Sequence, residues 1–214
     1  MSILLNVSIG EALDKLTILD IKCEILSGNK YFESKKEYDM IYEKTEQYIN
    51  KYIFYYKCLK YINKKIWEMQ DNVKKMSTTD NNFNNLWNKI TIFNDIRFRL
   101  KNKINIATNS DYKEQKGYDE KIKKIIVATE YNNLEQIINI VRYISICYDY
   151  TYVYTDYDNE IKKWFNDDKT IYVLSKKTIE KSDDECYYLN DLNNMETNEI
   201  LNINEFDFFY KNAI

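Results

Sequence analysis

The chain has 214 residues, of which 44% are apolar, and its 31 basic and 34 acidic side chains leave a net charge of −3. It contains no histidine, which excludes the catalytic pairs and metal sites that depend on imidazole. Its four cysteines are far apart and lack the spacing of a zinc site. We therefore expect free thiols in a reducing intracellular setting, with neither a metal ion nor a cofactor.

The distribution of charge predicts two units. Residues 1–121 carry 21 basic and 17 acidic side chains, a net charge of +4, whereas residues 122–214 carry 10 and 17, a net charge of −7. We place the domains at residues 1–118 and 119–214. Neither is basic enough to indicate nucleic-acid binding. No run of 18 apolar residues and no basic leader segment is present, so we expect no membrane insertion.

The first predicted elements are a strand at residues 3–7 and a helix after it. Ser8 and Glu11 form the S-x-x-E pattern of a capping box, in which both side chains bind backbone N–H groups of the first turn. Apolar residues on nearly every face predict that this helix is central to the fold. Residues 27–29 (Ser-Gly-Asn) predict its end after Leu26.

Residues 32–76 contain neither proline nor glycine and predict one long helix, or two with a break whose position stays open. Spacings of three and four residues alternate along a seam, as in a coiled coil. A third helix is predicted for residues 82–107, and the helices form an antiparallel bundle. The seam consists of Tyr42, Thr45, Ile49, Tyr52, Tyr56, Leu59, Asn63, Ile66, Gln70 and Val73.

The apolar pattern changes to short runs in the second half of the chain. Alternating strands and helices indicate a parallel sheet with right-handed crossovers. We therefore predict an α+β protein, in which an N-terminal α-helical bundle precedes a small Rossmann-like α/β unit, with the apolar tail at residues 206–210 packed on the body. Strands are predicted at residues 125–129, 151–155 and 170–175, with a candidate fourth at 186–189, and helices at residues 134–147 and 159–165.

Four motifs lie in the first half of the chain. They are VSIGEALDKLTILDIK at residues 7–22, Asn63 with Ile66 and Trp67, NDIRFRLKNKIN at residues 94–105, and EQKGY at residues 114–118. In this order they resemble the motifs of an uncharacterised family of short, mostly helical proteins from bacteria and viruses. The resemblance covers residues 1–118, and Gln115 and Gly117 depart from the fourth motif.

The resemblance implies a helical fold without an assigned function. The link of bacterial members to surface-polysaccharide genes implies a leaning toward glycan or nucleotide-sugar biology. The abundance of Asn, Lys, Ile and Tyr is typical of AT-rich coding DNA, such as that of a giant DNA virus.

The motifs place polar side chains on apolar helix faces, which allows two interpretations. In a pocket, Lys15 and Arg97 would bind an anionic small molecule, and Glu11 or Asp14 would act as acid or base. Alternatively, the side chains form an interior salt-bridge network with Asn63 as a register device. We favour the network, because buried ion pairs define geometry as often as chemistry. The candidates are Glu11, Asp14, Lys15, Asn63, Asn94, Arg97 and Lys101.

Candidate ligand contacts also follow the predicted strands, because ligands of parallel sheets bind beyond the carboxyl ends of the strands. Thr129, Asp156 and Asp158 occupy such positions, and the aspartates suit a ribose or a cation. However, the turn after the first strand has no glycine, and a phosphate cradle needs close backbone approach. We therefore favour solvated loop residues over a dinucleotide site.

Two functions stay open. The first is a non-catalytic binding or scaffolding module that pairs with a protein partner, or with another copy of itself, through the helical seam. The second is an enzyme or accessory domain of glycan or nucleotide-sugar metabolism that binds an anionic small molecule. We favour the first because the sequence carries no catalytic signature, and we expect a cytoplasmic protein, in the host cytoplasm or the virion if its source is a virus.

Overall fold

A computed structural model of the chain describes residues 5–80, 82–112, 124–128, 134–166, 168–175 and 186–188. These residues belong to two compact units, one up to residue 112 and one from residue 124 onward. The predicted domain boundary and the apolar tail at residues 206–210 lie outside the described residues.

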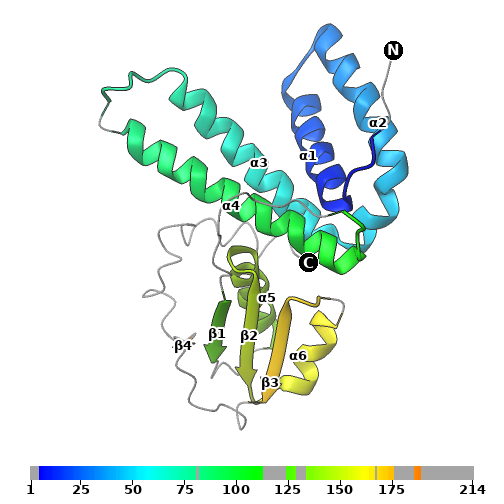
Figure 1. Cartoon of the computed structure of the whole chain (residues 1–214), viewed down its shortest axis with the longest axis vertical. Coiled ribbons are helices and arrows are strands. Elements are labelled where there is room, and N and C mark those ends of the chain that lie inside the picture. Colours follow the sequence, from blue (N-terminus) through cyan, green and yellow to red (C-terminus); the bar gives the residue numbers. More distant parts are fainter. Residues whose placement is uncertain are drawn as a thin grey trace. The chain divides into compact units, whose positions relative to one another are not determined.

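Helices build the first unit: α1 (Ile9–Ile25), α2 (Gly28–Lys51), α3 (Ile53–Val73) and α4 (Phe83–Thr108). α1 and α2 form one hairpin, and α3 and α4 form another (Figure 1). α1 packs against all three of the others. Its central position, predicted from its apolar faces, is confirmed, because Leu13, Leu16 and Leu19 are at most 1% exposed. Leu59, Ile62 and Leu100 extend this core into α3 and α4.

The segment before α1 and the start of α2 both differ from the prediction. Residues 5–7 have no regular secondary structure, so the predicted strand is wrong there; a strand needs a hydrogen-bonded neighbour, and the described residues of this unit offer none. α2 begins at Gly28, earlier than predicted. Gly28 has a φ of 58°, a left-handed conformation that glycine adopts without steric cost, so α2 follows α1 after a very short turn.

Tyr52 interrupts the long helical segment, with φ −117° and ψ 37°. Two helices with a break, one of the two predicted alternatives, is therefore the observed arrangement. The central part of the seam is buried inside the unit, so a partner using it would have to replace contacts within the chain. The buried seam residues are Thr45, Ile49, Tyr52, Tyr56, Leu59, Asn63 and Ile66.

The second unit contains a parallel sheet in the order β3-β2-β1-β4. The elements are β1 (Lys124–Ala128), α5 (Leu134–Cys147), β2 (Tyr150–Thr155), α6 (Asp158–Phe165), β3 (Ile171–Ser175) and β4 (Cys186–Tyr188). Val153 and Val173 pack in one core with Val141 of α5 and with Ile161 and Phe165 of α6. Both helices therefore cover the same face of the sheet, and the protein is of the predicted α+β class.

The state of three cysteines and the hydropathy of the helices are defined within the described residues. Cys23, Cys58 and Cys147 are free thiols, and the last two are buried. Among the helices of the described residues, none has the length and hydropathy that crossing a bilayer requires.

Candidate functional site

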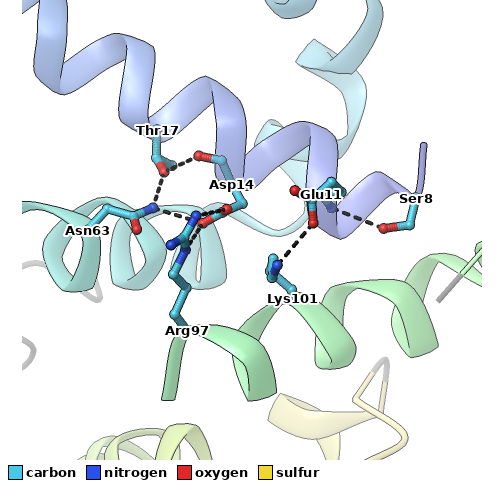
Figure 2. Close-up of polar contacts among 7 residues, drawn as sticks. All are labelled: Ser8, Glu11, Asp14, Thr17, Asn63, Arg97 and Lys101. Atoms are coloured by element: carbon cyan, nitrogen blue, oxygen red, sulfur yellow. Dashed lines mark hydrogen bonds and ion pairs between the residues drawn. The ribbon is translucent and has the colours of Figure 1, made fainter. Parts of the chain in front are cut away.

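Two side chains contact the start of α1: Ser8, which precedes the helix, and Lys101 of α4. Ser8 accepts a hydrogen bond from the Glu11 backbone N–H at 3.1 Å, so the predicted N-cap is correct. The Glu11 carboxylate accepts from Lys101 Nζ of α4 at 2.9 Å (Figure 2). The acidic side chain in the first turn therefore ties α1 to α4.

Asp14, one turn further along α1, is the centre of the cluster. Its side chain is only 1% exposed. Arg97 of α4 donates to both carboxylate oxygens, from Nε to Oδ1 at 2.9 Å and from Nη2 to Oδ2 at 2.6 Å. This two-point geometry fixes direction as well as distance (Figure 2). A carboxylate so deeply buried requires such partners, because an uncompensated buried charge is costly.

Asn63 connects the third helix to the same carboxylate. Its side-chain amide lies 2.8 Å from Asp14 Oδ1 and 2.8 Å from Thr17 Oγ1, and Thr17 in turn donates to the Asp14 carbonyl at 2.8 Å. Asn63 is 5% exposed. One polar seam position thus sets how α3 lies on α1, as a polar residue in a coiled-coil seam sets register.

Gly10 and Asn105 form a contact that the sequence analysis missed. Gly10 N donates to Asn105 Oδ1 at 2.7 Å, and Asn105 is fully buried. A Cβ added to Gly10 would lie 2.4 Å from the Lys101 carbonyl oxygen. The only sequence signal is that Gly10 belongs to the first motif and Asn105 ends the third.

Two other candidate residues, Lys15 and Asn94, form their contacts away from Asp14. Lys15 forms an ion pair with Glu37 of α2 at 2.8 Å, with side chains 55% and 42% exposed. Asn94 donates to the Ile90 carbonyl of its own helix at 2.9 Å. Of the predicted helical residues, the structure brings five together in two neighbouring groups (Figure 2), which we call the cluster: Glu11 with Lys101, and Asp14 with Asn63 and Arg97.

A second polar network joins α1 to α3. Lys60 Nζ lies 2.7 Å from both Asp20 Oδ2 and Glu24 Oε1, and Tyr56 donates to Asp20 at 3.3 Å. Burial alone would lower the pKa of Lys60, but its hydrogen bonds to the two carboxylates raise that pKa overall. Burial, followed by the charge of Asp20, raises the pKa of Tyr56. These shifts keep the lysine charged and the tyrosine protonated, as a structural role requires.

This network predicts a small dependence of stability on pH. The hydrogen bond from Lys60 lowers the pKa of Glu24 below its usual value of 4.5. A carboxyl shifted in this direction stabilises the fold above its unfolded pKa, and that contribution is lost as the pH falls through the folded pKa. Because Glu24 is 42% exposed, we expect Glu24→Gln to cost at most about 1 kcal/mol at pH 7 and less near pH 3. Urea denaturation at both pH values checks this, and an unchanged difference would contradict it.

In the second unit, Asp156 is exposed after β2 and Asp158 begins α6, whereas Thr129 lies outside the described residues. Within the described ranges, no group of three acidic or cysteine side chains is placed to hold a metal ion. Asp168, which the sequence analysis did not single out, accepts from the Thr170 backbone at 2.9 Å and from the Thr170 hydroxyl at 2.6 Å. Burial raises the pKa of Asp168. It shapes the turn into β3.

The motifs that meet in this cluster lie within a match to a known family. The model of a family of unknown function (DUF6165) matches residues 3–139. The chain belongs to this family. The match extends past residue 118, through β1 and into α5, so the family covers more than the helical unit in which the motifs were noticed. No curated protein and no solved structure matches the chain.

Proposed function

We propose that the chain is a non-catalytic binding or scaffolding module, in which the polar motif residues fix the packing of the helical unit. The observation that best supports this role is the burial of Asp14, which is 1% exposed while its oxygens accept from Arg97 and Asn63. A general base must lie within hydrogen-bond reach of a substrate proton. The neighbours of this carboxylate occupy the positions that such a substrate would need.

The charges of the candidate side chains also compensate one another. Within the cluster, Arg97 faces Asp14 and Lys101 faces Glu11; outside it, Lys15 faces Glu37 on α2. A pocket for an anion directs its cations at the ligand. Mutual pairing therefore supports a role in helix packing over the binding of an anionic molecule between the helices.

A thermal-shift panel of nucleotides, nucleotide sugars and sugar phosphates tests this proposal on the full chain. A ligand that binds the folded state raises the melting temperature in a saturable way. We expect that none of these compounds raises the melting temperature by binding at the cluster. A rise that Lys101→Gln abolishes would contradict the proposal, provided that Lys15→Gln, which removes an ion pair outside the cluster, retains it.

The second unit supports an alternative site for an anionic small molecule. The order β3-β2-β1-β4 is that of the first four strands of the Rossmann fold, and we infer that this unit is Rossmann-like. In such sheets ligands bind beyond the carboxyl ends of the strands, where the order reverses. A rise in melting temperature that Asp156→Asn or Asp158→Asn abolishes, and Lys101→Gln does not, would favour this alternative and an enzymatic or accessory role.

A further inference from the structure

The joint between α2 and α3 consists of a single residue. Helical hydrogen bonds flank it, from Tyr52 N to Tyr48 O at 2.9 Å and from Tyr56 N to Tyr52 O at 3.1 Å. Tyr52 itself has φ −117° and ψ 37°. An α-helix requires φ near −63° and ψ near −42°, which tyrosine adopts freely. Rotation at this one residue would therefore join α2 and α3 into one straight helix from residue 28 to residue 73.

The local sequence does not impose the bend. Residues 32–76 contain neither glycine nor proline, and the spacing of the seam continues in phase through Tyr52. The bend is instead stabilised by tertiary contacts. The Tyr52 hydroxyl donates to the Ala107 carbonyl at the end of α4 at 3.0 Å, and the Asp14 cluster joins α1 to α3 and α4.

Straightening would separate the two hairpins and leave each one intact. The pair of Lys15 with Glu37 lies within the α1–α2 hairpin and would persist. The pairs of Glu11 with Lys101 and of Asp14 with Arg97 join the hairpins and would break. Fully buried leucines, such as Leu16 and Leu100, would then lose their cover. Each uncovered face is matched in shape and charge by the hairpin that covered it before, and a second copy of the chain can supply that hairpin.

We propose that the protein forms a domain-swapped dimer by straightening at Tyr52, in which the α1–α2 hairpin of each copy packs on the α3–α4 hairpin of the other. The contacts between the two hairpins of the closed chain then re-form between copies, as is general for exchanged elements. The proposal goes beyond the proposed function because it names a partner, a second copy of the chain, and a mode of assembly that uses the buried seam.

Charge reversal across the hairpins tests the exchange. Glu11→Lys places two lysines opposite each other in a closed chain, and Lys101→Glu places two glutamates opposite each other. Only a swapped heterodimer of the two variants restores both opposite-charge pairs. After the full-length variants are unfolded together and refolded, we expect native mass spectrometry to show at least about tenfold more heterodimer than either homodimer.

A matched pair of variants provides the control. Lys15→Glu and Glu37→Lys reverse an ion pair that stays within one hairpin in both states. Mixing them cannot restore that pair by exchange at Tyr52, so we expect no excess of heterodimer. The proposal is overturned if the Glu11 and Lys101 variants give no excess, or if the control pair gives the same excess.

A second measurement covers the case in which the charge variants do not fold. Ile53 is the first residue of α3, where proline is tolerated, but it would be interior in a straight helix, where proline is strongly disfavoured. We expect Ile53→Pro to leave a folded monomer and to reduce the dimer association constant of the otherwise wild-type chain by at least about 100-fold, measured by light scattering. An unchanged constant, or no dimer of the wild-type chain at any concentration, would refute the exchange.

Discussion

Replacing Arg97 by methionine is expected to lower the free energy of unfolding by about 3–5 kcal/mol, the usual cost of leaving a buried charge without its partner. Methionine preserves most of the apolar stem of the side chain but removes both donors to Asp14. The Asp14 carboxylate, 1% exposed, then keeps only the amide of Asn63 among the side-chain donors described above. Urea denaturation followed by helical circular dichroism measures the loss.

A double substitution distinguishes the cost of breaking the pair from the value of the pair itself. Asp14→Leu combined with Arg97→Met removes both charges, and we expect it to recover most of the loss, because apolar replacements of buried pairs are often neutral. The matched control is Lys15→Met, which removes an exposed pair with Glu37 and should change stability by at most about 0.5 kcal/mol. Equal effects of Arg97→Met and Lys15→Met would refute a structural role for the cluster.

Local signals in the sequence predicted where α1 starts and that this helix is central to the fold. Ser8 acts on the backbone three residues away, so its role as a cap could be recognised without knowing the fold. The position of the break at Tyr52 could not, because every residue around it is compatible with a helix. The bend depends on a hydrogen bond to Ala107, which is distant in sequence.

The same limit applies to the candidate site. The motifs and their helical spacing placed Lys15 and Lys101 among the candidates, but they could not assign the partners of these side chains, since the choice depends on which helices α1 contacts. Lys15 pairs with α2, whereas Lys101 pairs with the start of α1. Asn105 carries no periodic signal at all, because its role depends on the close approach of α4 to Gly10.

The close approach of α4 to Gly10 leads to a prediction opposite to the one that helix propensity gives. Alanine is preferred to glycine inside a helix by about 0.5–1 kcal/mol, so propensity alone predicts that Gly10→Ala stabilises the protein. Its Cβ, however, would lie 2.4 Å from the Lys101 carbonyl oxygen and 2.8 Å from Asn105 Oδ1. Because the nearest of these atoms belongs to the backbone of α4, the helices must move apart, which weakens the buried hydrogen bond between Gly10 and Asn105.

We therefore expect Gly10→Ala to destabilise the protein by about 3 kcal/mol, from overpacking and the weakened buried hydrogen bond together. Asn105→Ala should not rescue it, since the clash with the backbone carbonyl remains. Gly28→Asn is the control, because nothing lies near that Cβ position and asparagine tolerates the left-handed conformation; we expect a cost below about 1 kcal/mol. A Gly10→Ala variant as stable as the wild type would mean that α1 and α4 are not in close contact at this point.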